Sequence, residues 1–330
     1  MNSTPTPTVA PPRPRREITG INPVRARARV RELLHRELLS PADLIVPILV
    51  QPDARPPEQY TYVPTAVAIS ELGPYAVGLR ELGIRACKVF VYCDAKAPDA
   101  AEALRPDNLM VAAIQTIRAA VEDMVISTEV CGCAWTDSGE CVITDADGRT
   151  DVEATYLLMG KMAVLHAQAG ADLIGPAAML DGSVRIIRRG LHEHGYPDVG
   201  ITPSVIFDSG LFTAYKSAMC TDPGRGNRRG FQIDADHQRQ AMAQAERWMS
   251  EGADSLLVQP AMMSVDVLTR LRLVTEAPIT AFSVSQEQQM FAAADDGLVL
   301  EYARMLRRAG ADFIMTYDAP RIAAALAGGR

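Results

Sequence analysis

The 330-residue sequence lacks several features that define other protein classes. It has no run of about 18 apolar residues, so we expect no transmembrane segment. Residues Met1 to Arg16 are rich in Pro and Thr and lack the apolar core of a secretory signal, so we expect a cytoplasmic protein. The net charge of −7 argues against nucleic acid as a general partner.

The region before residue 41 has too few apolar residues to form a core of its own. Residues 1–24 are rich in Pro and Arg, which predicts a disordered tail. Residues 25–40 form a predicted N-terminal arm with arginines at positions 25, 27, 29, 31 and 36. This arm is either a solvated segment with a short helix or a segment that packs on a neighbouring subunit.

Cysteines cluster at one place in the chain. Cys131, Cys133 and Cys141 follow an apolar segment, 124–130, that is typical of a strand. The two-residue spacing places the first two thiols on one side of an extended chain, and the polar loop is long enough to return the third. Three thiolates without a nearby fourth suit a zinc ion with an open position for water or substrate. A disulfide, disfavoured in a cytoplasmic protein, and three unrelated buried thiols are the alternatives.

After residue 40, short apolar segments alternate with helical ones. The joint Ala-Gly-Ala-Asp or Glu-Gly-Ala-Asp recurs at 169–172, 251–254 and 309–312, with a glycine that ends a helix before each strand. This recurrence predicts a (β/α)8 TIM barrel over residues 41–330, with a lid at about 208–235. The eight predicted strands lie at 44–50, 87–92, 124–131, 172–176, 200–207, 254–258, 279–284 and 312–317.

In such a barrel the chemistry belongs at the carboxyl ends of the strands. Besides Cys131 and Cys133, these ends hold four residues that we single out as candidate contacts for a substrate. They are Phe207, Gln259, Ser285 and Tyr317.

Several motifs along residues 25–328 are specific in combination. They are Leu39-Ser-Pro-Ala-Asp-Leu-Ile-Val-Pro47, Cys131-x-Cys133 with Cys141, Ala169-Gly-Ala-Asp172, Met179-Leu-Asp-Gly182, Gly226-Asn-Arg-Arg-Gly-Phe-Gln232, Val258-Gln-Pro-Ala261, Val284-Ser-Gln-Glu287 and Ala309-Gly-Ala-Asp-Phe-Ile-Met-Thr-Tyr317. Together they resemble the motifs of the porphobilinogen synthase family, also called 5-aminolevulinate dehydratase. The resemblance implies zinc bound by the three cysteines, and homo-octamers built from dimers whose N-terminal arms wrap around neighbours.

The resemblance also implies which side chains bind substrate carboxylates. Ser285 and Tyr317 match a serine and a tyrosine with this role, and each can donate one hydroxyl hydrogen bond. Arg228 and Gln232 match residues of a mobile lid, and the Arg228 guanidinium suits a carboxylate through paired donors. Without the resemblance, Tyr317 reads as an ordinary strand-end aromatic and Arg228 as a solvated charge.

The chain departs from the family at the residues that perform the chemistry. The family joins two molecules of 5-aminolevulinate through Schiff bases on two lysines, whose positions hold Ile206 and Gln259 in this chain. Neither side chain can form an imine, which needs a free amine. Phe207, the aromatic residue after the first position, is kept. Lys216, one of four lysines, stands at the position of a lid arginine and is predicted to grip a carboxylate, with a solvated lid charge as the alternative.

Three acidic residues are candidates for new acid–base chemistry. Glu140 lies next to the metal loop, where a carboxylate can take a proton from a zinc-bound water. Asp137 and Asp208 are its rivals. For all three the alternative is a solvated loop charge.

Three functions are compatible with these residues. The main hypothesis is a zinc-dependent enzyme of this family with a rebuilt site, which performs condensation and dehydration on small amino- or keto-carboxylic acids without lysine imines, in specialised metabolism. The second is authentic porphobilinogen synthase activity. The third is a non-catalytic homologue that binds a carboxylate.

Overall fold

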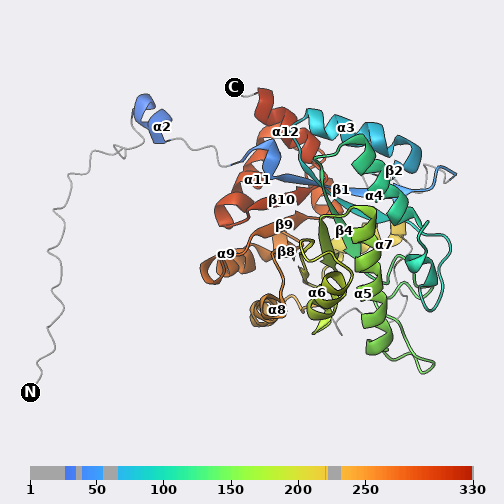
Figure 1. Ribbon diagram of the computed structural model, residues 1–330. Coiled ribbons are helices and arrows are strands. Elements are labelled where there is room, and N and C mark those ends of the chain that lie inside the picture. The colour runs from blue at the N-terminus through green and yellow to red at the C-terminus, as the bar shows by residue number, and fades with distance from the viewer. Residues whose placement is uncertain (1–26, 35–38, 55–65, 220, 222–231, 329–330) are drawn as a thin grey trace, which may run out of the picture. The chain divides into compact units, whose positions relative to one another are not determined.

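The computed structural model describes residues 27–34, 39–54, 66–219, 221 and 232–328 (Figure 1). The chain divides into two units, Met1–Glu37 and Leu38–Arg330. The described element of the first unit is helix α2, Ala28–Leu34. The predicted tail, 1–24, lies outside the described residues, as do parts of the predicted arm, 25–40. The packing of this arm on a neighbouring subunit therefore stays a prediction.

The second unit is built on one parallel sheet in the order β6-β5-β4-β3-β1-β10-β9-β8-β7, with β2 paired to β1. In Figure 1 the helices surround these strands. The strands are β1 Leu44–Gln51, β2 Ala66–Ala68, β3 Ala86–Val91, β4 Val125–Val130, β5 Leu173–Pro176, β6 Gly200–Ile201, β7 Ser204–Ile206, β8 Leu256–Gln259, β9 Ile279–Ser283 and β10 Phe313–Thr316.

The order closes on itself, because the first and last strands on this path, β6 and β7, are two pieces of one chain segment. Residues 202–203 separate the pieces, β6 pairs with β5, and β7 pairs with β8. We predicted a single strand over 200–207. Pro203 has no N–H for the ladder, and the strand is divided next to it. The prediction of a TIM barrel is confirmed.

The helices follow the predicted alternation. The sequence predicts helical structure over 287–310 with a break near 295–297, and two helices occupy this stretch. The second begins there because the Asp295 side chain caps it by accepting a hydrogen bond from the Leu298 N–H. The α-helices are α3 Leu72–Glu81, α4 Leu109–Ala120, α5 Val152–Ala169, α6 Ser183–Glu193, α7 Thr213–Met219, α8 Gln238–Glu251, α9 Val265–Val274, α10 Ser285–Met290, α11 Asp296–Ala309 and α12 Ala319–Gly328. The 3-10 turns are η1 Pro41–Asp43, η3 Ile69–Glu71, η4 Ala101–Leu104, η5 Gly210–Phe212 and η7 Met262–Ser264.

The three Gly-Ala-Asp joints form the same structure at the amino ends of the strands. In each, the aspartate carboxylate accepts one hydrogen bond from an isoleucine N–H on the neighbouring strand and one from an arginine. We call each set an arginine–aspartate clamp. The clamps are Asp172 with Ile126 and Arg118, Asp254 with Ile201 and Arg188, and Asp312 with Ile279 and Arg272.

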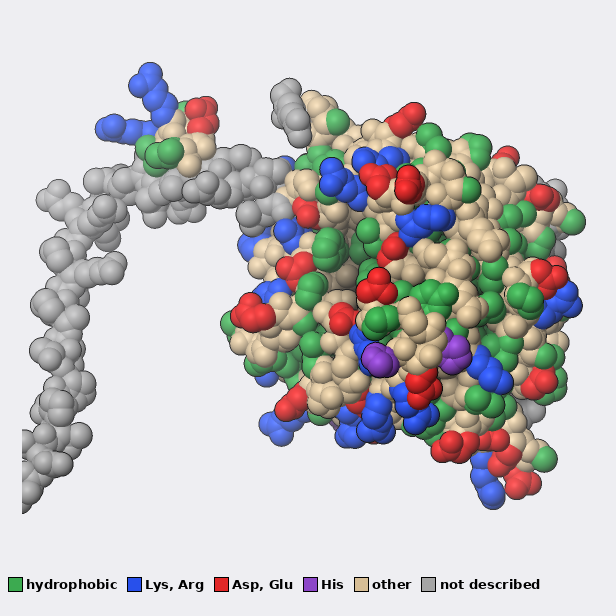
Figure 2. Space-filling model, viewed as in Figure 1, with side chains coloured by type: hydrophobic (Ala, Val, Ile, Leu, Met, Phe, Trp, Pro, Cys, Tyr) green, Lys and Arg blue, Asp and Glu red, His purple; other side chains and the backbone are tan. Residues whose placement is uncertain are grey.

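The described helices include none that is long and apolar enough to cross a membrane. On the face seen in Figure 2, acidic and basic side chains of the barrel are interspersed.

Candidate active site

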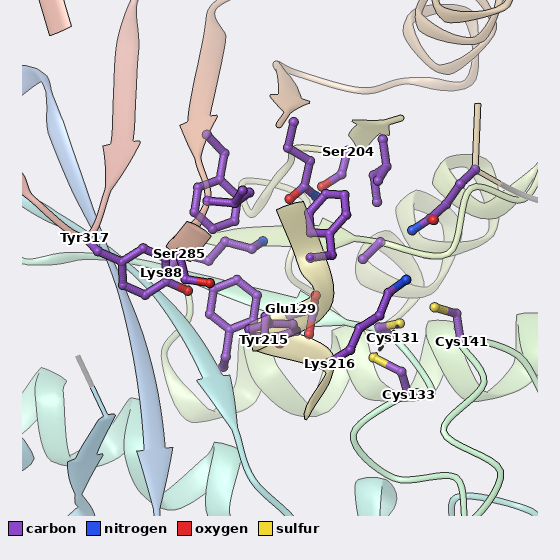
Figure 3. Close-up of a pocket in the computed structure, with 18 residues that line it drawn as sticks. Lys88, Glu129, Cys131, Cys133, Cys141, Ser204, Tyr215, Lys216, Ser285 and Tyr317 are labelled. Carbon is purple, nitrogen blue, oxygen red and sulfur yellow. Dashed lines mark hydrogen bonds between the residues drawn. The ribbon is translucent and has the colours of Figure 1, made fainter. Parts of the chain in front are cut away.

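A cavity opens at the carboxyl ends of the barrel strands (Figure 3). Its wall contains the cysteine cluster, residues from seven strands or their ends, and residues around α7. In Figure 3, Tyr317, Ser285 and Lys88 are drawn on one side of the view and the cysteines on the other. The lining residues are Lys88, Phe90, Glu129, Cys131, Cys133, Cys141, Ala177, Ser204, Ile206, Phe212, Tyr215, Lys216, Gln232, Gln259, Phe282, Val284, Ser285 and Tyr317.

The cysteine cluster forms because the loop after β4 folds back on itself. The Gly132 N–H donates to the Cys141 carbonyl over 3.1 Å. A β-carbon on Gly132 would lie 2.8 Å from the same carbonyl oxygen, so a glycine is needed for this close approach. The Thr136 hydroxyl donates to the Glu140 carbonyl and fixes the returning strand of the loop. The loop thereby carries Cys141 to the end of β4.

The three thiols are placed to hold a metal ion. Their sulfur atoms all lie within 4.8 Å of one another, and all three residues are buried. Cys131 Sγ and Cys133 Sγ are 3.3 Å apart. The neighbouring thiols and burial raise the pKa of Cys131 well above its usual value, so this thiol stays protonated. A thiophilic cation would favour the deprotonated thiolates by binding them. The donor set fits zinc or another thiophilic metal.

Four of the predicted substrate-binding residues face the same space. Ser285, Tyr317, Gln232 and Lys216 line the cavity. Among the described residues, Ser285 Oγ and Gln232 Oε1 are buried without a hydrogen-bond partner. Burial and the Glu129 charge raise the pKa of Tyr317, so its hydroxyl stays protonated and can donate. Unpaired polar atoms are costly inside a protein unless a ligand supplies partners, so these groups are suited to a polar ligand.

Two further predicted contacts have different positions. Phe207 is buried and does not belong to the described lining, and its N–H donates to the Gln259 carbonyl. Gln259 itself lines the cavity. Arg228 lies outside the described residues.

The three predicted acid–base residues are not among the described residues that line the cavity. Asp137 is exposed, whereas Glu140 and Asp208 are half-buried. A different carboxylate, Glu129, does line it, one residue before the end of β4. The roles of Asp137, Glu140 and Asp208 stay predictions.

Lys88 is a cavity residue that sequence reasoning did not select. It lies on β3, is 3% exposed, and donates to the Thr128 carbonyl over 3.3 Å. Burial lowers the pKa of Lys88 to about 8, against the opposite effect of the Glu129 and Cys131 charges. A lone lysine in an otherwise apolar barrel strand is the signal that would have indicated it.

The chain is similar to known proteins over nearly its whole length. The family model of delta-aminolevulinic acid dehydratase matches residues 20–325. The delta-aminolevulinic acid dehydratase of Synechococcus elongatus is 31% identical over 309 residues, with 90% of this chain and 95% of that protein covered. That of Staphylococcus aureus strain Mu50 is 32% identical over 311 residues, with 91% and 96% covered.

A solved structure agrees with these sequence matches. The Toxoplasma gondii enzyme, in complex with the reaction product porphobilinogen, aligns with a TM-score of 0.88 and 28% identity over 94% of this chain and 92% of its own. The chain belongs to the delta-aminolevulinic acid dehydratase family. This dehydratase family comprises lyase-type enzymes.

The two residues at the positions where the resemblance implies lysines lie in the cavity wall. Ile206, at the end of β7, and Gln259, at the end of β8, both line the cavity and are buried. The two strands are neighbours in the sheet, and Ile206 pairs with Gln259 in register. At the positions where the resemblance places two amines, this dehydratase relative therefore presents one apolar and one amide side chain.

Proposed function

We propose that the protein is a zinc-dependent dehydratase that condenses two molecules of 5-aminolevulinate to porphobilinogen. The observation that supports this most is that one cavity combines the cysteine cluster with hydroxyl, amide and amine groups that suit a carboxylate, in a chain that belongs to this family. The names of its relatives supply the substrate and the product.

Within this proposal, the chain's own side chains hold the acid. Ser285 and Tyr317 donate hydroxyl hydrogen bonds to a substrate carboxylate, and Gln232 adds an amide. Lys216 supplies a positive charge at the lid side of the cavity. Because these groups are largely buried, their hydrogen bonds and charge act in a low dielectric and orient the substrate strongly.

The metal and the acid–base group complete the proposed site. Cys131, Cys133 and Cys141 would hold the zinc, which would supply Lewis-acid chemistry to the site. Glu129 is the carboxylate in the cavity wall that can move a proton to or from a bound substrate.

The direct test is incubation of the zinc-loaded protein with 5-aminolevulinate, followed by a colour reaction for the pyrrole. Pyrrole formation that depends on the metal supports the proposal. A zinc-loaded, folded protein that yields no pyrrole at any pH between 6 and 9 contradicts it.

A second candidate function is favoured by Ile206 and Gln259. Both replace lysines that the resemblance implies for catalysis, so the reaction can be a related condensation and dehydration on another amino- or keto-carboxylic acid without imines at those positions. A panel of such acids, analysed for loss of water by mass spectrometry, tests it. Metal retention without turnover on any member of the panel would instead favour a binding protein.

A further inference from the structure

Two of the chain's four lysines line the cavity. Lys96 donates to the Met219 carbonyl over 3.0 Å, and Lys161 is exposed on α5. Lys88 and Lys216 remain as cavity amines. Lys216 is carried on the short helix α7, whereas Lys88 stands on the central part of a barrel strand.

The position of Lys88 is fixed by its neighbours on three strands. β3 lies between β1 and β4, and Lys88 pairs with Pro47 on one side and Ser127 on the other. Its amine is 5.7 Å from the centre of the Phe90 ring, which is on the same face of β3 two residues further on. A β-carbon on Gly175, in β5, would lie 2.1 Å from Lys88 Nζ, so the glycine leaves the space that the amine occupies.

The bonding of the amine suits a neutral nucleophile better than a structural ammonium. The Thr128 carbonyl is its hydrogen-bond acceptor among the described residues. An ammonium has three donors, and a buried cation is stable only when it is well paired. A neutral amine needs fewer hydrogen-bond partners and no opposite charge. Burial also lowers the pKa of Lys88 to about 8, which makes the neutral form available near physiological pH.

We propose that Lys88 is the catalytic amine of this protein and forms an imine with the ketone of a bound keto acid. The amine nitrogen bonds to the carbonyl carbon, the carbon–oxygen bond breaks, and the oxygen leaves as water with the two amine hydrogens. Lys88 thus performs, from β3, the step for which Ile206 and Gln259 lack a nucleophile. This inference rests on the proposed function only for the class of substrate, a small keto acid.

Reductive trapping tests the inference directly. The zinc-loaded protein is incubated with levulinate, a keto acid without an amine that cannot condense with itself, and then reduced with borohydride. We expect the intact protein to gain the mass of one keto acid less one oxygen atom, and peptide mapping to place the gain on Lys88. A gain on Lys216, or no gain after reduction, overturns the inference.

Three variants separate nucleophile from charge. Lys88→Met and Lys88→Arg remove the amine, the second with the positive charge kept, and we expect both to lose the adduct. We also expect turnover to fall on the order of a millionfold in both, the scale of loss measured when a covalent nucleophile is removed. The exposed Lys161→Met is the matched control and should label and turn over as wild type does. If Lys88→Arg retains turnover, the residue is a cationic grip and the inference is wrong.

The two proposals fail in different ways. An adduct on Lys88 without any pyrrole from 5-aminolevulinate leaves the inference standing and contradicts the proposed function. Pyrrole formation in a folded Lys88→Met variant does the reverse. Thermal melting of each variant verifies that it is folded before it is scored.

Discussion

The amine of Lys88 occupies the space that a side chain on Gly175 would need. The ideal β-carbon at Gly175 would lie 2.1 Å from Lys88 Nζ and 2.9 Å from the Thr128 carbonyl oxygen. Both contacts are too close for any real β-carbon. The glycine on β5 and the lysine on β3 therefore form a complementary pair across β4.

This pair predicts the effect of adding one methyl group. Gly175→Ala should lower the free energy of unfolding by about 1–3 kcal/mol, the usual cost of overpacking, and should reduce imine trapping at Lys88. In a Lys88→Ala background the cost should be smaller, because one of the two clashes is gone. Urea denaturation of the two single variants and the double variant measures the coupling. Gly78→Ala, which would meet nothing within 4 Å on a helix, is the control and should be neutral or slightly stabilising.

The cysteine cluster predicts a stoichiometric metal. Elemental analysis of the purified protein should find one zinc per chain, and Cys133→Ser should lower the affinity by more than about a hundredfold, since even outer-shell changes cost 10–100-fold. Turnover should be lost together with the metal and should return to the wild type when zinc is added back. Cys93→Ser, a buried cysteine outside the cluster, serves as the control. Full turnover in metal-free protein would rule out a catalytic role for the ion.

We expect opposite effects on kcat from substitutions of the two carboxylates near the metal loop. Glu129 lines the cavity, whereas Glu140 is not among the described lining residues. Glu129→Gln should lower kcat by about 10²–10⁴-fold, the usual contribution of a general acid or base, and Glu140→Gln should change it little. The reverse result would restore Glu140 as the acid–base residue. Zinc content measured on both variants excludes an indirect effect through the metal.

His166 predicts a loss of stability in acid. It is fully buried on α5, its Nδ1 lies 3.0 Å from the Thr128 hydroxyl, and burial together with the Lys88 charge lowers its pKa to about 3. In the unfolded chain His166 binds a proton below about pH 6.5, whereas in the native chain it stays neutral down to about pH 3. The free energy of unfolding therefore falls as the pH drops through this window. Between pH 7 and 4, His166→Gln should lose roughly 3 kcal/mol less than wild type.

Denaturant titrations at several pH values test this difference. The exposed His192→Gln on α6 is the matched control and should follow the wild-type curve. Parallel curves for wild type and His166→Gln would show that the histidine does not stay neutral in the native state.

The clamps predict a change in stability without a change in chemistry. Asp312 accepts from Ile279 N–H and Arg272, both over 2.8 Å, so Asp312→Ala leaves two donors without this acceptor. We expect a loss of about 2–4 kcal/mol, with unchanged turnover per folded molecule. Asp147→Ala, at an exposed pair with Arg149, should stay within about 0.5 kcal/mol. A fall in kcat for folded Asp312→Ala would link the clamp to the site.

The sequence was sufficient for the barrel because its signals are local. The repeated Gly-Ala-Asp joint and the short apolar segments recur along the chain, and the structure places strands at all eight predicted positions. The fifth strand is predicted as continuous but is divided next to Pro203, which has no N–H for the ladder. The signal for the cysteine cluster is also local, because all three cysteines lie within eleven residues of one loop.

The rest of the site could not be found in the same way. The register between neighbouring strands decides which of their side chains face the cavity. The register of β3 and β4 brings Lys88 and Glu129 into the same cavity wall. Proximity to the metal loop in sequence favoured Glu140, although the fold gives the wall position to Glu129. The space for the Lys88 amine is provided by Gly175, which lies 87 positions later in the chain, so no local sequence pattern reveals it.

The clamps and the cavity lie at opposite ends of the barrel strands. At the amino ends, aspartate carboxylates join neighbouring strands by accepting hydrogen bonds from backbone N–H groups, whereas the cavity opens at the carboxyl ends. Substitutions of cavity residues leave the clamps unchanged, so a lineage can replace one nucleophile by another without first acquiring compensating stability. Such a separation gives the barrel room to change its chemistry while its architecture is inherited intact.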